Sequence, residues 1–442
     1  MFGDKRCTGY HCKTTNIQRG IPFGYVCDPV SMTNNPPQPI ALESRAVNFK
    51  ALPPLSLYIH VPWCVRKCPY CDFNSHEVRG ARSPIEGEHE KQKIPEQQYV
   101  AALIRDLELS LPLIWGRKVY TVFFGGGTPS LLSGESITQI LRNVRMLLPL
   151  DINAEITLEA NPGTVEAARF AAYREAGVNR LSMGIQSFND AHLQALGRIH
   201  SADEARRAIE TAQQHFDNLN LDLMYALPNQ KLDEALQDVQ TALSFAPQHL
   251  SCYHLTLEPN TLFYRNPPAL PDDDLSSEMQ QRIEAFLAGK GYQHYETSAF
   301  AQPKCRAKHN LNYWKFGDYL GIGAGAHSKL SFPDKVIRQA RYKQPQAYMQ
   351  QVDKAAPIQT EHPVSRDDLG FEFMMNALRL NEGFDSTLFQ ERTSLPLLSI
   401  QRELADAERR GLLFRDHQRI APTKLGQRFL NDLLEIFLHE KK

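Results

Sequence analysis

Short apolar runs rich in β-branched and aromatic residues alternate with helical patterns from Leu55 onward, and this alternation restricts the fold more than any other feature of the sequence. We expect strands at residues 55–60, 119–124, 155–160, 180–185, 219–227 and 249–257. Strands separated by helices form parallel β/α units, whose ligands bind at the carboxyl ends of the strands. The sequence therefore predicts an α/β fold, a (β/α)6 partial barrel of the TIM type, with a further strand within residues 292–300.

Two local signals mark helix boundaries within this pattern. Ser201 and Glu204 have the spacing of a capping box, in which each side chain bonds a free backbone N–H of the first helical turn. Gly177 follows an apolar helical segment and is expected to end that helix in the left-handed conformation.

The chain is expected to contain four regions. Residues 1–50 lack periodicity and contain NNPPQP, so we expect a disordered extension or an artefact of the assigned start. The barrel is expected at residues 51–300, a connecting region at 301–360, and a small C-terminal domain at 365–442 whose order of helices and short strands resembles a winged helix. This domain has 12 Lys and Arg against 13 Asp and Glu. We therefore expect a docking module and no binding of nucleic acid.

Composition places the chain among ordinary globular proteins of a reducing compartment. Its 442 residues carry a formal net charge of -1, and no run is apolar enough for membrane insertion or a signal peptide. The 8 cysteines are too sparse for a disulfide scaffold, so we expect a cytoplasmic protein. In the extension, Cys7, His11, Cys12 and Cys27 fit no metal signature and are more simply explained as free thiols.

Three cysteines, Cys64, Cys68 and Cys71, follow the first expected strand with the spacing C-x3-C-x2-C. Three thiolates leave one iron of a 4Fe-4S cluster open to an outside molecule, which makes such a cluster reactive. Structural zinc prefers four protein ligands, and the fourth would have to be His60 or His76 in an unusual arrangement. We therefore expect an iron–sulfur cluster at this motif.

The cysteine triplet and its place after the first strand resemble the radical S-adenosylmethionine (SAM) superfamily. The resemblance implies a 4Fe-4S cluster whose open iron is chelated by the amino and carboxylate groups of SAM. Tyr70, between the second and third cysteines, matches the aromatic position that contacts the SAM adenine in the family. Ordinary packing within the loop would also explain Tyr70.

A run of three glycines ends the second expected strand and is followed by Thr128. Glycine lets the backbone approach a ligand without a Cβ in the way, although such a run also serves as a plain tight bend. Its place matches the site for the SAM amino group in the family, at Gly126, Gly127 and Thr128. The resemblance implies further SAM contacts for five polar residues, each of which would also serve to cap a helix or satisfy the backbone: Tyr58, Glu159, Gln186, Arg198 and Asp222.

Within the superfamily, the chain resembles the anaerobic coproporphyrinogen oxidase family over residues 51–440. The oxidising enzymes of that family have a further cysteine two residues after the third, where this chain has Phe73. The chain also contains HNLNYW, a string typical of the haem-chaperone group of the family. Its His309 is the candidate haem ligand, with Tyr313 and Trp314 as flat surface for the porphyrin, although a structural role would produce the same string.

Two further segments near this string have expected roles. Cys305 is a weaker second candidate for haem, because the C-x-x-C-H signature of covalent attachment is absent. The small residues of segment 321–328 are expected to let a loop close over the SAM site.

The resemblance implies a haem chaperone that passes haem to an acceptor, expected to be a membrane respiratory complex, and it leaves dimerisation open. One alternative is an oxygen-independent coproporphyrinogen III dehydrogenase, which uses a SAM-derived radical on propionate side chains. Another is a radical enzyme with a different substrate. Phe73 and the HNLNYW string favour the chaperone, so whether the chain is an enzyme stays an open question.

Overall fold

A single large sheet organises the chain, with strands in the order β14-β13-β12-β11-β1-β4-β5-β6-β7-β8-β10-β9. Its central strands pair in parallel, each with the next along the chain. They are the six strands expected from the sequence: β1 (Leu55–Val61), β4 (Val119–Gly126), β5 (Leu150–Ala160), β6 (Arg180–Gln186), β7 (Leu219–Tyr225) and β8 (His249–His254). The predicted α/β partial barrel is therefore confirmed.

The computed structural model describes residues 47–78, 94–114, 116–163 and 168–438. The chain divides into two units, Met1–Ser44 and Arg45–Lys442, and every described residue belongs to the second unit. The four metal candidates of the extension, Cys7, His11, Cys12 and Cys27, lie outside the described residues.

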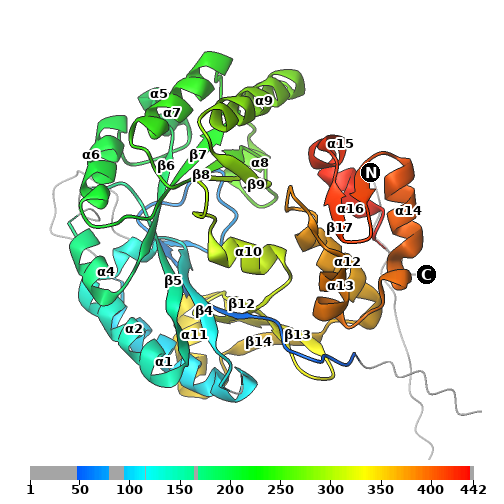
Figure 1. The fold of residues 1–442 in the computed structure, drawn as a ribbon. Helices are drawn as coiled ribbons and strands as arrows, with labels where there is room; N and C mark the ends of the chain where they lie inside the picture. Colours follow the sequence, from blue (N-terminus) through cyan, green and yellow to red (C-terminus); the bar gives the residue numbers. More distant parts are fainter. Residues whose placement is uncertain (1–46, 79–93, 115, 164–167, 439–442) are drawn as a thin grey trace, which may run out of the picture. The chain divides into compact units, whose positions relative to one another are not determined.

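Helices cover the outer face of the curved parallel strands (Figure 1). They are α1 (Glu96–Ile114), α2 (Gly134–Leu147), α4 (Phe170–Ala176), α5 (Asp190–Ala195), α6 (Ala202–Gln213), α7 (Leu232–Ser244) and α9 (Asp273–Gly289). The capping box predicted at Ser201 and Glu204 begins α6, and Gly177 ends α4 with a φ of 106°. The short helices α8 (Leu262–Arg265) and α10 (Lys308–Trp314) have no place in this outer layer, and α10 lies on the inner side of the sheet (Figure 1).

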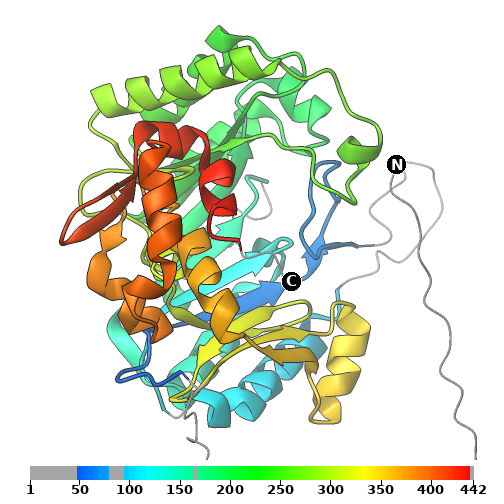
Figure 2. The same ribbon diagram turned by 90° about the vertical axis from the view of Figure 1, so that its right-hand side faces the viewer.

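The sheet is larger than the sequence predicts at both edges. The expected seventh strand is a hairpin of β9 (Gln293–Glu296) and β10 (Ala299–Ala301), and β10 pairs antiparallel to β8. Segment 301–360, expected to be a connection, instead extends the sheet beyond β1, as the yellow strands of Figure 2 show. It forms β11 (Asp318–Ile322), β12 (His327–Ser331), β13 (Val336–Arg341), α11 (Pro345–Asp353) and β14 (Ile358–Pro363).

Tertiary pairing explains why these extra strands escape prediction. β11 has only five residues, with Gly321 among them, and its pairing with β1 is parallel and remote in sequence. β14 is exposed along most of its length, so its sequence has no apolar alternation. Neither strand carries the period-two pattern by which a half-buried strand is recognised.

The C-terminal region has the element order of a winged helix, as expected. Its three-stranded antiparallel sheet has the order β15-β17-β16. The elements are α12 (Arg366–Ala377), β15 (Phe384–Asp385), α13 (Ser386–Thr393), α14 (Gln401–Arg409), β16 (Leu413–Arg415), β17 (Arg419–Pro422), α15 (Lys424–Arg428) and α16 (Leu430–Glu435). The final helix of the prediction is thus two short helices. Val47 and Phe49, assigned to the extension, are buried in the core of this region.

A buried ion pair joins the outer helices to the extended part of the sheet. Arg341 at the end of β13 bonds Asp106 of α1, and both side chains are fully buried. Tyr348 of α11 donates to the same carboxylate at 2.8 Å, and the backbone N–H of Gly323 donates to it at 3.2 Å. The pair therefore fixes α11 and the turn after β11 against α1.

Replacing Arg341 with Ala should lower the free energy of unfolding by about 3–5 kcal/mol, because it leaves the Asp106 carboxylate buried without its cation. Replacing Arg105, whose pair with Glu108 on the same helix is exposed, should cost less than about 1 kcal/mol. Urea titration of both variants measures the difference. Equal, small losses would show that the pair does not hold this part of the sheet.

Candidate functional site

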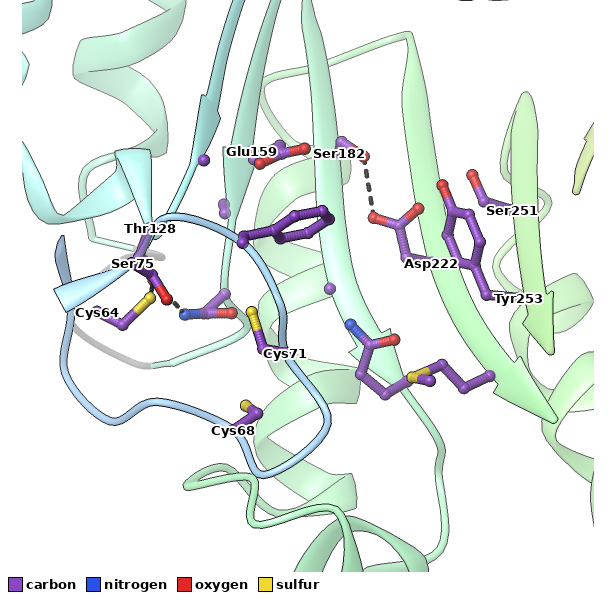
Figure 3. A pocket seen from close by; sticks show the side chains of 18 of the residues that line it. Cys64, Cys68, Cys71, Ser75, Thr128, Glu159, Ser182, Asp222, Ser251 and Tyr253 are labelled. Atoms are coloured by element: carbon purple, nitrogen blue, oxygen red, sulfur yellow. Dashed lines mark hydrogen bonds between the residues drawn. The ribbon is translucent and has the colours of Figure 1, made fainter. Parts of the chain in front are cut away.

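The cysteine loop begins where β1 ends, at the carboxyl edge of the parallel sheet. It leaves β2 (Trp63–Cys64) and returns at β3 (His76–Glu77), which pairs with β2. The thiols of Cys64, Cys68 and Cys71 are free and half-buried, and all three line one cavity of about 450 Å³ (Figure 3). The structure thus brings the predicted cluster ligands together at the end of the barrel where ligands bind.

The chemistry of the loop suits a cluster better than a single metal ion. Among the described residues, no three His, Cys, Asp or Glu side chains form a group suited to one metal ion. Both ring nitrogens of His60 are in hydrogen bonds, to Tyr58 and to the Asn74 carbonyl, and a ring nitrogen of His76 bonds the Lys343 carbonyl. Of the two candidates for a fourth zinc ligand, His60 therefore has both ring nitrogens engaged and His76 has one.

Hydrogen bonds reach two of the three sulfurs from the segments that follow β4 and α5. Thr128 donates to Cys64 Sγ at 3.4 Å, and Arg198 donates to Cys68 Sγ at 3.7 Å. Asn161 joins the two, since it donates to Thr128 and accepts from Arg198. Donors to sulfur tune the potential of a bound cluster. Burial raises the pKa of the Cys64 thiol, so the free thiol is neutral. Binding of a metal would displace the proton of this thiol.

The glycine run is required by neighbouring protein atoms. A Cβ on Gly126, whose φ is 111°, would lie 2.5 Å from the His60 ring, and one on Gly127 would lie 2.6 Å from the Trp63 carbonyl oxygen. The sequence interpretation attributed these glycines to close approach of a ligand. Packing against the end of β1 is sufficient to explain them, and both residues also line the cavity.

Two carboxyl groups line the cavity, Glu159 on β5 and Asp222 on β7 (Figure 3). Burial, and then the charge of Asp222, raise the pKa of Glu159 to about 8. Burial also raises the pKa of Asp222, which accepts hydrogen bonds from Ser182 and Asn220. A pair of buried acids of this kind favours a cationic ligand, because a positive charge would stabilise both ionised forms.

Most residues predicted to contact SAM line this same cavity, and one does not. The residues that line it are Tyr70, Gly126, Gly127, Thr128, Glu159, Gln186, Arg198 and Asp222. Gln186 has a φ of 69°, a strained conformation of the kind that persists at functional sites. Tyr58 instead lines a second cavity, where its ring stacks on Phe123.

The second cavity adjoins the first and encloses about 790 Å³. The two share five lining residues: Asp72, Phe73, Ser75, Gly126 and Glu159. Phe73, which stands where the oxidising enzymes have a cysteine, is 63% exposed. The segment 321–328 contributes only to the second cavity, through Gly325 and His327. It therefore does not cover the cavity of the cysteines, contrary to the expectation from the sequence.

The HNLNYW string forms α10, and its residues face different surroundings. His309 is 6% exposed and lines the first cavity, where its ring contacts Phe123 with centroids 4.2 Å apart. Tyr313 packs on Tyr319 beside the second cavity, while Trp314 lies under the guanidinium of Arg379. The sequence suggested that Tyr313 and Trp314 form one flat surface for a porphyrin. The structure contradicts this expectation, because the two rings face different surroundings.

Glu155 holds the beginning of α10. Its carboxylate accepts from the backbone N–H groups of Lys308 and His309, and it bonds His309 Nδ1 at 2.9 Å. Burial acts to raise the pKa of Glu155, but the hydrogen bonds from His309 and from the Lys308 N–H, with the charge of Arg180, hold that pKa below its usual range. Burial lowers the pKa of His309. Cys305 packs against the buried cluster of Tyr295, Ala299 and Ala301 and lines neither of the two cavities.

Several cavity residues were not identified from the sequence. They are Asn161, Arg180, Ser182, Ser251 and Tyr253. Asn161 directly follows an expected strand and was therefore open to prediction. Arg180, Ser182 and Ser251 lie within apolar runs, where a polar residue gives no sign of the face to which it points.

Comparisons with known proteins assign the chain to a family. The model of the radical SAM superfamily matches residues 58–242, and the HemN C-terminal domain matches residues 364–429. The heme chaperone HemW of Escherichia coli K12 is 48% identical over 391 residues, which cover 88% of this chain and 99% of that protein. The bovine mitochondrial radical S-adenosyl methionine domain-containing protein 1 is 34% identical, with 92% and 90% covered.

Among solved structures, the coproporphyrinogen III oxidase HemN of Escherichia coli has a TM-score of 0.73 and 25% identity, covering 87% of this chain and 90% of that one. Fold and cysteine loop together thus define a radical SAM protein. Given the extent of the sequence identity, the chain belongs to the HemW family. In the part of the chain that is described, no helix has both the length and the apolar character needed to cross a membrane.

The raised pKa of Glu159 predicts a pH-dependent stability of the protein without bound cofactors. The unfolded side chain loses its proton near pH 4.5 and the folded one near pH 8, so the free energy of unfolding should fall as the pH rises between these values. Glu159→Gln should flatten this slope and be the more stable protein at about pH 8.

Urea titrations at pH values of about 5, 6.5 and 8 measure the slope. Glu210→Gln, a change of an exposed carboxylate on α6, is the control and should follow the wild type. A Glu159→Gln slope equal to that of the wild type would contradict the burial of a protonated acid in this cavity.

Proposed function

We propose that the chain is a haem chaperone, which binds haem, carries a SAM-ligated 4Fe-4S cluster and passes haem to an acceptor protein. The observation that carries the proposal is the 48% identity to a heme chaperone over 99% of that protein's length. The exposed Phe73, in the place of the further cysteine of the oxidising enzymes, supports the chaperone over a coproporphyrinogen III dehydrogenase.

The residues of the first cavity suit the cluster and SAM. Cys64, Cys68 and Cys71 would hold three irons, and the fourth iron would be left for the amino and carboxylate groups of SAM. A cluster held by these residues would supply electron-transfer chemistry beside SAM. The side-chain Nε of Arg180 and that of Arg198 are buried without a partner among the described residues. Such donors favour a ligand that brings an acceptor.

The other proposed SAM contacts have distinct tasks. Glu159 and Asp222 would stabilise the positive charge of SAM, and Tyr70 would offer its ring to the adenine. The turn of Gly126, Gly127 and Thr128 would direct backbone groups toward the amino acid part of SAM. Gln186, Arg198 and, from the second cavity, Tyr58 complete the proposed set.

His309 is the haem ligand proposed from the sequence, and the structure gives that proposal a specific consequence. Its Nδ1 is bound to Glu155, an arrangement that in metal sites presents the other ring nitrogen to the metal. However, His309 lines the same cavity of about 450 Å³ as the SAM residues. Haem on His309 would therefore have to compete with SAM.

The remaining parts of the proposal concern the cellular setting. The acceptor is proposed to be a membrane respiratory complex, with the HemN C-terminal domain of this chain as the docking module. Thiols that hold an iron–sulfur cluster need a reducing compartment, so we place the protein in the cytoplasm.

A paired assay tests the function on protein reconstituted anaerobically. Haem is titrated by its absorbance, and coproporphyrinogen III is offered separately with SAM and a reductant. Stoichiometric haem binding without loss of carbon dioxide supports the chaperone. Turnover of coproporphyrinogen III would establish the dehydrogenase instead.

Replacing Cys68 with Ala should remove the iron–sulfur absorbance, because two thiolates cannot hold the cluster. The far-ultraviolet circular dichroism should stay unchanged, since Cys68 is half-buried on a loop. Cys305→Ala, at a thiol that lines neither cavity, is the matched control and should keep the cluster. A cluster retained in Cys68→Ala would refute the ligand assignment.

A further inference from the structure

The second cavity combines aromatic, lysine and histidine side chains with two carboxyl groups, Asp72 and Glu159. Its volume of about 790 Å³ lies within the roughly 300–1,000 Å³ of sites for ligands of this size. Two lysines, Lys67 and Lys343, are exposed at its edge, and the aromatic side chains of Tyr313 and Tyr319 form part of its wall. The Lys67 ammonium donates to the carbonyls of Phe73 and Ser75 at 3.2 and 3.4 Å. Haem requires an axial ligand, apolar contact for its ring and cations for its two propionates.

His327 is the imidazole of this cavity for which neither ring nitrogen has a hydrogen-bond partner among the described residues. It stands at the first position of β12 with its side chain exposed. Of the other two imidazoles of the cavity, His60 uses both ring nitrogens in hydrogen bonds, and His76 uses one to bond the Lys343 carbonyl.

The surroundings also favour the neutral form of His327, which is the form that binds iron. Partial burial lowers the pKa of His327, and the nearby cations Lys343 and Arg338 lower it further. A neutral imidazole keeps a lone pair for the metal at neutral pH.

The turn that precedes His327 is held rigidly. Asn74 of the cluster loop donates to the carbonyls of Ala324 and Lys343, each at 3.0 Å. Tyr99 accepts from the backbone N–H of Ala324, and the buried pair of Asp106 and Arg341 fixes the neighbouring Gly323. Because His327 directly follows this rigid turn, its backbone loses little conformational freedom when its side chain binds a metal.

Phe73 contributes an exposed apolar side chain to the lining of the second cavity. Its side chain is 63% exposed, which is costly for a large apolar group on a loop, and it lines both cavities. A porphyrin ring in the second cavity would cover one side of Phe73, while SAM at the cluster would lie on the other.

We infer that haem occupies the second cavity, with His327 on the iron, Lys67 and Lys343 at the propionates and Phe73 against the ring. The inference rests on the proposed haem chaperone function and replaces His309 with His327 as the iron ligand. Its consequence is that haem and SAM bind side by side and do not compete.

The test is a haem titration of the full chain with its cluster reconstituted, followed by the absorbance of bound haem. His327→Ala should weaken haem binding by at least about tenfold, since even the outer partners of metal ligands contribute that much. His327→Met should restore part of the affinity with a changed haem spectrum, because a thioether is a different axial ligand. Saturating SAM should leave haem affinity unchanged.

His362→Ala is the control, since His362 is an exposed histidine on β14 that lines neither cavity. All variants should keep the iron–sulfur absorbance and the thermal midpoint of the wild type. Unchanged haem affinity and spectrum in His327→Ala would overturn the inference alone, as would competition between SAM and haem. Failure of the wild type to bind haem would overturn the proposed function as well.

Discussion

Two backbone hydrogen bonds position the whole site, because they join the glycine turn to the start of the cluster loop. The N–H of Gly127 donates to the Val61 carbonyl at 2.7 Å, and the N–H of Thr128 donates to the Trp63 carbonyl at 2.8 Å. They extend the pairing of β1 and β4 by two residues beyond the sheet and place Thr128 against Cys64. The same turn supplies the Gly126 N–H that bonds Glu159. The position of one cysteine and of one acid thus depends on a single turn, in which a Cβ would collide with β1.

The carboxyl groups within the barrel fall into two kinds. Glu159 and Asp222 line the first cavity, whereas Glu155 does not. Deeper in the barrel, Glu155 accepts hydrogen bonds from two backbone N–H groups and bonds the His309 ring. Asp222 accepts from the neutral side chains of Ser182 and Asn220, and burial keeps the pKa values of Glu159 and Asp222 raised. Glu155, which holds the beginning of α10, is therefore ionised. Glu159 and Asp222 would be stabilised in their ionised forms by a bound cation. This difference between neighbouring carboxyl groups supports a structural role for Glu155 and a binding role for Glu159.

The sequence predicts those parts of the fold whose signals are local. The six parallel strands have long apolar runs, and Ser201 and Gly177 mark helix ends by chemistry within one turn of the chain. The strands β11 and β14 depend on partners distant in sequence and show no such pattern. The same limit applies to the site, because the cysteine spacing is visible along the chain, while the separation of His309 from His327 into different cavities exists only after folding.

The loop that would bind the cluster also forms the border between the two cavities, and this arrangement relates cofactor to cargo. Phe73 follows Cys71 by two residues, and Asp72 and Ser75 of the same loop line both cavities. Binding of Cys71 to an iron would restrict the backbone of Phe73. It would thereby restrict the position of the Phe73 side chain that is proposed to contact haem. Thermodynamic linkage then requires the effect to be reciprocal, so that haem in the second cavity stabilises the cluster-bound loop by the same factor. An exposed phenylalanine at this position suits a protein that holds a porphyrin next to the cluster, whereas a cysteine there would offer a reactive thiol.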